Sequence, residues 1–205
     1  MGLKKGVKYP AEPLTHEEVV KLLDQFKSST PAGDRDLAVA ILMVAAGLRI
    51  SEALGIRMRD LNREQGIIHI AHGKGDRSRK IGLHDEGWKI VGRWIERRKK
   101  LKLPEDALLF CTIPRGHEPG GRPIHRENYR KEFYAKVKKA GLQGRVHPHA
   151  LRHTFAFEAV KDGMKPYEIQ MQLGHSSLDM TQKYINHLLP TELRDSMRKR
   201  TWAYG

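Results

Sequence analysis

Apolar residues recur at helical spacing near the start of the chain, in the segment PLTHEEVVKLLDQF. The residues that would share one face are Val19, Leu22, Leu23 and Phe26. Thr15 precedes this stripe, and Glu18 lies three residues after Thr15, which is the spacing of a capping box at a helix N-terminus. The pattern therefore predicts an amphipathic helix that begins after Thr15 and packs one face against a core.

The next segment, DRDLAVAILMVAAG, is apolar on nearly all sides. A helix of this composition has to be covered all round, so the segment predicts a buried helix. Gly47 is suited to end it, because glycine readily adopts the left-handed conformation that follows many helices. The segment LRISEALGI then predicts another short helix, which Ser51 could cap.

Two isoleucine-rich runs flank the glycine-rich, basic segment HGKGDRSR. Ile67, Ile68 and Ile70 come before it, and Ile81 and Leu83 come after it. Short apolar runs on either side of a glycine-rich turn are typical of a β-hairpin. The pattern predicts an antiparallel hairpin with an exposed, basic tip.

The remainder of the chain has the pattern of helices joined by polar loops. Helices are predicted over about Asp85 to Lys100, over HRENYRKEFYAKVKKAGL, over about His149 to Lys161, over about Pro166 to Leu173, around Tyr184 and from Thr191. The run DALLFC predicts a short strand, and TIPRGHEPGGRP predicts a loop. The predicted fold is mainly α with a small antiparallel β-sheet (α+β), in one domain.

Composition adds a strong charge signal. The 205 residues include 38 Lys and Arg against 24 Asp and Glu, a net charge of +14. Such an excess favours a polyanionic partner, although a solvated basic surface is the simpler alternative. No apolar run is long enough to span a membrane. The single cysteine, Cys111, forms no intramolecular disulfide, fits a reducing cytosol and is expected to be a buried strand residue.

Cationic side chains and one tyrosine stand at positions where a phosphate could be bound. Two arginines, a lysine and two histidines suit a pentavalent phosphate, because arginines clamp its non-bridging oxygens and preplaced charge stabilises the transition state. A tyrosine hydroxyl becomes a usable nucleophile beside such a cluster and a general base. The candidates are Arg49, Lys74, His149, Arg152, His175 and Tyr184.

The segments that carry these residues resemble the tyrosine recombinase, or phage integrase, family. They are GLRISE, GKGDRSR, HALRHTFA and LGHSSLDMTQKY, and their order and approximate spacing match the catalytic domain of that family. The resemblance covers almost the whole chain, from about Pro13 to the last predicted helix. It implies the tyrosine recombinase catalytic-domain fold and a site-specific recombinase or integrase that acts on double-stranded DNA.

The resemblance also implies a role for each candidate residue. Tyr184 attacks the scissile phosphate and forms a 3′-phosphotyrosyl link, which releases a 5′-hydroxyl. Arg49 and Arg152 bind the non-bridging oxygens, and Glu52 supports the arginines. The remaining roles fall to Lys74 as general acid, His149 in proton transfer and His175 as a hydrogen-bond donor to the phosphate. The link retains the phosphodiester energy, so no cofactor, neither ATP nor metal, is expected.

Further basic residues could contact DNA or be solvated. They are Arg77 and Arg79 on the hairpin and Arg126, Arg130 and Lys131 on the helix after the loop. The resemblance implies a homotetramer on DNA. We expect a monomer free in solution and a location in the cytoplasm, associated with the nucleoid.

Domain organisation is expected to be simple. Residues 1–13 are expected to be a basic tail or interdomain linker, and residues 14–205 the catalytic domain. Most family members carry an N-terminal core-binding domain as well. Its expected absence suggests either a catalytic fragment or a minimal enzyme.

Alternative functions remain open at this stage. A type IB topoisomerase shares the chemistry, and a non-catalytic DNA-binding protein could share the fold. His149 and His153 are four residues apart and could both ligate zinc, but no third ligand has matching spacing. A metal-dependent nuclease is a further alternative, but this sequence lacks the acidic cluster that two-metal chemistry requires. His147 is expected in a loop. His153, next to Arg152, is expected to turn toward another face of the helix as a structural hydrogen-bonding residue.

Overall fold

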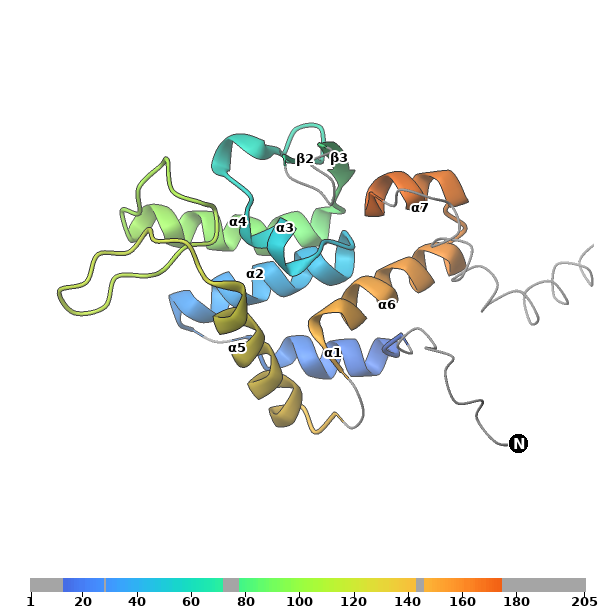
Figure 1. Cartoon of the computed structure of the whole chain (residues 1–205), viewed down its shortest axis with the longest axis horizontal. Coiled ribbons are helices and arrows are strands. Elements are labelled where there is room, and N and C mark those ends of the chain that lie inside the picture. Colours follow the sequence, from blue (N-terminus) through green and yellow to red (C-terminus); the bar gives the residue numbers. More distant parts are fainter. Residues whose placement is uncertain (1–12, 28, 72–77, 143–145, 175–205) are drawn as a thin grey trace, which may run out of the picture.

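The computed structural model describes residues 13–27, 29–71, 78–142 and 146–174. Its elements are α1 (His16–Asp24), α2 (Pro31–Ala45), α3 (Ile50–Leu54), the 3₁₀ turn η1 (Met58–Asp60), β1 (Leu61–Asn62), β2 (Ile67–Ile70), β3 (Arg79–Gly82), α4 (Asp85–Lys100), α5 (Arg126–Lys139), α6 (Pro148–Lys161) and α7 (Pro166–Leu173). Helix α2 packs against both α4 and α6 and lies between them (Figure 1). The predicted fold class, mainly α with a small antiparallel sheet, is confirmed.

The first helix begins as the sequence predicts. Thr15 Oγ1 accepts a hydrogen bond from the Glu18 N–H at 3.2 Å, and Glu18 Oε2 accepts one from the Thr15 N–H at 2.8 Å. Leu22 and Phe26 are fully buried. The Leu14 N–H donates to Thr154 Oγ1 at 2.9 Å, which ties the start of α1 to α6.

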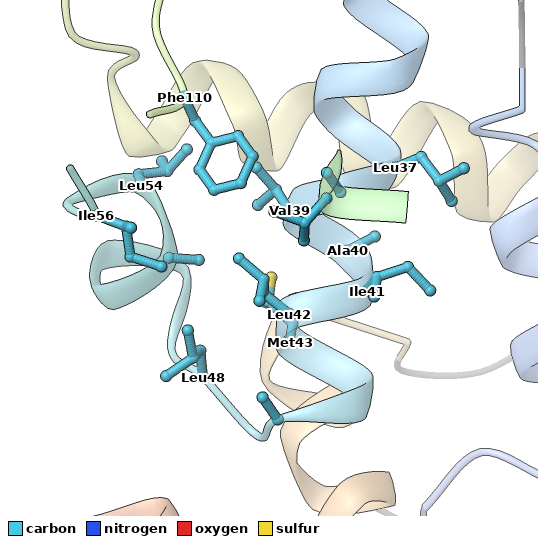
Figure 2. Packing of buried hydrophobic residues seen from close by; sticks show 14 of the residues in the cluster. Leu37, Val39, Ala40, Ile41, Leu42, Met43, Leu48, Leu54, Ile56 and Phe110 are labelled. Atoms are coloured by element: carbon cyan, nitrogen blue, oxygen red, sulfur yellow. The ribbon is translucent and has the colours of Figure 1, made fainter. Parts of the chain in front are cut away.

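The central helix is buried all round, as its composition predicts. Residues 36–43 are all buried, and their apolar side chains pack with Phe110, Leu48 and Ile56 (Figure 2). The helix begins three residues earlier than the apolar pattern suggests, because Thr30 caps it through the Gly33 N–H and Pro31 suits the first turn. Gly47 follows its end at φ +67°, which confirms the left-handed residue expected there.

The predicted hairpin is strands β2 and β3. Ile68 pairs with Ile81 and Ile67 pairs with Gly82 in an antiparallel ladder. Strand β1 extends the sheet on the other side of β2, so the order is β1-β2-β3. The pattern did not predict β1, because two residues are too few to show a period.

The expectation of a strand at DALLFC is wrong. This segment makes isolated bridges, between Leu108 and Arg57 and between Cys111 and Pro123, rather than a ladder. The buried Arg98 guanidinium donates to the carbonyls of Pro104, Ala107 and Leu108, and these bonds take acceptors that a neighbouring strand would need. Cys111 is nevertheless fully buried, as expected.

Helix α7 packs on α6 and on strand β3, and a small second core of Ala156, Ala159, Ile169 and Leu173 lies between the two helices. The helices predicted around Tyr184 and from Thr191 lie outside the described residues. Among the residues that the structure describes, no helix is long and apolar enough to cross a membrane.

Candidate functional site

Arg49 stands at the start of α3, held by the carboxylate of Glu52. Glu52 Oε2 accepts a hydrogen bond from the Arg49 backbone N–H at 2.9 Å, and Glu52 Oε1 accepts one from Arg49 Nη1 at 2.8 Å. The helix therefore begins at Ile50 with Arg49 as its N-cap residue, and Ser51, which was expected to cap it, lies inside its first turn. The Arg49 side chain is 23% exposed, so it reaches the surface while its base is fixed.

Glu52 is buried among arginines. Its carboxylate also accepts two hydrogen bonds from Arg79, at 3.1 Å from Nη1 and 3.0 Å from Nη2, and Arg152 Nη1 lies 3.8 Å from Oε2. Burial by itself would raise the pKa of Glu52, but the hydrogen bonds from Arg79 and from the Arg49 backbone lower it below its ordinary value. The carboxylate is therefore ionised at neutral pH, as the support expected for the arginines requires.

Arg152 projects from α6 into the interior and is 1% exposed. Its Nη1 donates to the Gly47 carbonyl at 2.6 Å and its Nη2 donates to the Leu173 carbonyl at 2.7 Å. The side chain thus joins the residue after α2 to the last residue of α7. A buried positive charge therefore lies within ion-pair distance of Glu52.

Three imidazoles line the start of α6. The His147 and His149 rings stack with centroids 6.3 Å apart, and the His149 and His153 rings meet edge to face at 4.5 Å. His147 is the N-cap residue, at the end of the preceding loop as expected. His153, expected on another face of the helix than Arg152, lies one turn after His149, which brings the two rings together.

His149 and His153 are neutral at physiological pH. Their partial burial lowers the pKa of each to about 4, and the positive charge of Arg152 adds to the effect. Although neighbouring groups partly bury the His149 ring, the residue as a whole is exposed at the surface. A neutral, accessible imidazole can accept a proton, which fits the role expected for His149.

A groove of about 480 Å³ brings several predicted residues together. Arg49 and His149 line it from α3 and α6, and Arg126 and Arg130 line it from α5. The described residues that line it include no carboxylate; they are Met43, Leu48, Arg49, Ile50, Ser51, Arg126, Arg130, Tyr134, His147, Pro148 and His149. Lys131, also predicted to contact DNA, is exposed on α5 but does not line the groove.

The sequence did not single out Tyr134 as a groove residue. Its side chain is 41% exposed, and the Arg130 guanidinium carbon lies 6.0 Å from the centre of its ring. The spacing of Arg130 and Tyr134, four residues apart on a helix predicted to meet DNA, is the signal that could have identified it. Arg126 and Arg130 both also contact the Glu127 carboxylate, at 3.1 Å.

The expectation for Arg79, a phosphate contact or a solvated side chain, needs correction. Its side chain is only 11% exposed, and its Nε donates to the Gln172 carbonyl at 3.1 Å while both Nη atoms bond Glu52. Arg79 is therefore an internal partner of the site. Lys74, Arg77, His175 and Tyr184 lie outside the described residues.

Metal-ligand clusters and a second groove also bear on what the protein could bind. The part of the chain that the structure describes contains no group of three or more His, Cys, Asp or Glu residues placed to hold a metal ion. A second groove, of about 800 Å³, runs along α4 and shares no lining residue with the first. None of the predicted site residues that the structure describes lines this second groove; its lining includes Arg93, which was not predicted to be part of the site.

Comparison with known proteins agrees with this geometry. Residues 12–189 match the sequence model described as the Phage integrase family. The chain is 32% identical to tyrosine recombinase XerD of Listeria monocytogenes serotype 4b over 183 residues, which are 89% of this chain and 60% of the relative. It is 32% identical to tyrosine recombinase XerC of Halalkalibacterium halodurans over 202 residues, covering 95% of this chain and 63% of the relative.

Solved structures give the same grouping. The crystal structure of XerA recombinase superposes with a TM-score of 0.78 at 27% identity and covers 98% of this chain and 68% of its own. The Tn1549 transposon integrase in complex with transposon right end DNA superposes with a TM-score of 0.77 at 25% identity and covers 96% and 68%. The chain spans about three fifths of the length of the curated relatives that it matches.

Proposed function

This chain belongs to the phage integrase family, and we propose that it is a site-specific DNA recombinase that cleaves and rejoins strands through Tyr184. The observation that carries the proposal is the groove in which Arg49 and His149 meet Arg126 and Arg130, with no carboxylate among the described residues that line it. A cleft lined by one sign of charge concentrates a polyanion, and two of the candidate catalytic residues, Arg49 and His149, line it.

In the proposed cleavage step, the Tyr184 oxygen attacks the scissile phosphorus while the bond from phosphorus to the 5′ oxygen breaks. The Tyr184 proton passes to neutral His149, and Lys74 protonates the leaving oxygen. Arg49 and Arg152 neutralise the non-bridging oxygens, and His175 donates a hydrogen bond to the phosphate. The 3′-phosphotyrosyl bond keeps the phosphodiester energy, so the reverse step reseals a strand without ATP or a metal ion.

Arg152 has to gain access to the phosphate to take this part, because the residue is 1% exposed. Its Nη1 and Nη2 each donate to a backbone carbonyl, those of Gly47 and Leu173. A guanidinium has five N–H donors, so we propose that these two bonds hold Arg152 in place while a further N–H donates to the phosphate.

Double-stranded DNA is the proposed partner, and the similar Tn1549 transposon integrase was solved in complex with transposon right end DNA, which supports a DNA partner. Residues 14–205 would form the catalytic unit and residues 1–13 a linker or tail. We propose a monomer free in solution, a homotetramer on DNA, and a cytoplasmic, nucleoid-associated location.

The decisive experiment uses covalent capture on a pool of nicked duplexes with a randomised core, in EDTA. A nick near the cleavage position releases a short end and traps the intermediate. We expect an SDS-resistant adduct with the wild-type protein and none with Tyr184→Phe. Tyr167→Phe is the matched control, because Tyr167 is 52% exposed on α7 and outside the groove, and it should form the adduct normally.

Each other outcome selects a different function. Tight DNA binding without an adduct would indicate a non-catalytic DNA-binding protein. If the protein forms the adduct and relaxes supercoiled plasmid but never exchanges strands between sites, it would be a topoisomerase. An adduct that survives in Tyr184→Phe would assign the nucleophile to another residue.

A further inference from the structure

Arg79 lies between the candidate site and helix α7. From strand β3, its guanidinium bonds both oxygens of Glu52, at 3.1 and 3.0 Å, and its Nε donates to the Gln172 carbonyl at 3.1 Å. Glu52 is 2% exposed, so this bidentate pair is shielded from solvent. The sequence separations are 27 residues to Glu52 and 93 residues to Gln172, so the contact joins three distant segments.

The surrounding backbone is shaped to admit Arg79. A Cβ atom on Gly174 would lie 2.8 Å from Arg79 Cδ and 2.9 Å from its Nε, and Gly174 has a φ of +64°. A side chain at position 174 would therefore collide with Arg79 and be strained in its backbone. The glycine of the LGH segment leaves the space that this arginine fills.

Gln172 strengthens the same junction. Its Oε1 accepts a hydrogen bond from the Gly82 N–H at 2.9 Å, and its Nε2 donates to the Gly82 carbonyl at 2.8 Å and the Ala46 carbonyl at 3.2 Å. Strand β3 is thus fixed to α7 on one side and, through Arg79, to Glu52 on the other. The position of the Arg79 guanidinium is set by both contacts.

We propose that Arg79 is a positioning residue for Arg49 that acts through Glu52. The inference rests on the proposed function. Four donor groups, two from Arg49 and two from Arg79, share the two oxygens of Glu52. Without Arg79, the buried carboxylate keeps its charge but loses half of these donors, and it draws the Arg49 guanidinium away from a phosphate in the groove.

Two other roles for Arg79 predict different behaviour. A direct phosphate contact acts on DNA whether or not Glu52 carries a charge. A purely structural residue changes how much protein is folded, not the rate constant of the folded fraction. Both can be separated from positioning by changing Arg79 and Glu52 together.

The experiment is a double-mutant cycle of Arg79→Met and Glu52→Gln. The single-turnover rate constant and the amplitude of adduct formation are measured on a duplex that the wild-type protein cuts. We expect Arg79→Met to lower the rate constant about tenfold to a hundredfold when Glu52 is present, the scale of a misplaced catalytic group. In the Glu52→Gln background, where no charge competes for Arg49, the same substitution should change it less than about threefold.

Controls keep structural and electrostatic effects apart. Arg79→Lys keeps the charge but cannot form the bidentate pair, so its rate constant should lie between those of Arg79→Met and the wild-type protein. Arg93→Met removes an equal charge from the groove along α4 and should leave the rate constant unchanged. Melting curves establish that every variant is folded at the assay temperature.

Equal rate losses in both backgrounds would overturn the proposal in favour of direct phosphate contact. A loss of amplitude alone would overturn it in favour of a structural role. If the wild-type protein forms no adduct, the proposed function fails, and the same four proteins are compared by affinity for a labelled 30-bp duplex. There the positioning role still predicts that Arg79→Met weakens binding only when Glu52 is present, and equal weakening in both backgrounds would again overturn it.

Discussion

Glu52 receives both the backbone N–H and the guanidinium of Arg49, at 2.9 and 2.8 Å. One carboxylate therefore starts helix α3 and orients the arginine that the same helix presents to the groove. Local folding and the chemistry of the site depend on the same ionised group. Changes that protonate or remove it should affect both.

Acid should destabilise the protein partly through Glu52. Its folded-state pKa lies below the ordinary value of 4.5, so its stabilisation is complete above that value and is lost as the pH falls through the folded-state pKa. We expect the free energy of unfolding of the wild-type protein to fall below about pH 4.5 more steeply than that of Glu52→Gln. Denaturant titrations at a series of pH values measure the difference, and parallel curves would contradict the prediction.

Adduct formation should be insensitive to histidine protonation near neutrality. The pKa of His149 is lowered to about 4, so the imidazole stays neutral between pH 6 and 8. If His149 accepts the Tyr184 proton, rate constants should be flat with respect to this group in that range and should fall only near its own pKa. Single-turnover assays test this, with His149→Asn expected to remove the acidic limb; a titration near pH 6.5 in the wild type would argue against it.

The same lowered pKa values affect stability. His149 and His153 bind protons more weakly folded than unfolded, so their contribution is complete above the ordinary value of 6.5 and is lost as the pH falls towards about 4. We expect His153→Asn to lose less free energy of unfolding than the wild-type protein between pH 7 and 5. The measurement is the midpoint of denaturant unfolding at the two pH values, and an equal loss in both proteins would refute the assignment.

Gly47→Ala should be strongly destabilising. Gly47 has a φ of +67°, and a Cβ atom there would lie 2.5 Å from Leu173 Cδ2 and 2.6 Å from Phe155 Cδ1. Gly141 is the matched control, since it has a φ of +65° and open space around a Cβ. The backbone cost of about 1–2 kcal/mol is common to both variants, and overpacking adds about 1–3 kcal/mol at position 47 alone. Chemical unfolding of the two variants should reveal that difference in the free energy of unfolding. Equal losses would mean that Leu173 and Phe155 move to make room for the methyl group.

Arg126 and Arg130 should supply phosphate contacts. Each lines the groove with Arg49, and each is well exposed, with side-chain exposures of 66% and 44%. We expect Arg126→Gln and Arg130→Gln each to weaken binding to duplexes of any sequence and to reduce the slope of log affinity against log salt by about 1. Fluorescence anisotropy at several salt concentrations measures the slope. Arg93→Met should leave it unchanged, and a loss confined to certain sequences would instead indicate contacts with bases.

Features set by neighbouring residues were predictable from the sequence. The capping box of Thr15 and Glu18, the left-handed Gly47 and the hairpin of β2 and β3 each follow from residue types only a few positions apart. The resemblance to the family also implied that Glu52 lies close to Arg49 and Arg152, because it gave Glu52 the role of supporting these arginines.

Features set by distant contacts were not predictable. Arg79 resembles its basic neighbours in sequence, and only the fold shows that Glu52 and the Gln172 carbonyl occupy its guanidinium. DALLFC has the composition of a strand, but Arg98 takes several of the carbonyls around it. Ser51 is a good capping residue in isolation, yet the Glu52 carboxylate starts the helix two residues earlier. In each case a charged side chain determines the partner of a backbone or carboxylate group.

The amide of Gln172 has a consequence for how the molecule behaves among its own copies. Strand β3 is the last strand of the order β1-β2-β3, and an open strand edge can recruit another chain into a growing sheet. By bonding both the N–H and the carbonyl of Gly82, the Gln172 side chain imitates a neighbouring strand at that position. A glutamine on a helix thereby occupies the backbone groups of β3 that the strand of another chain would need for edge-to-edge pairing at this position.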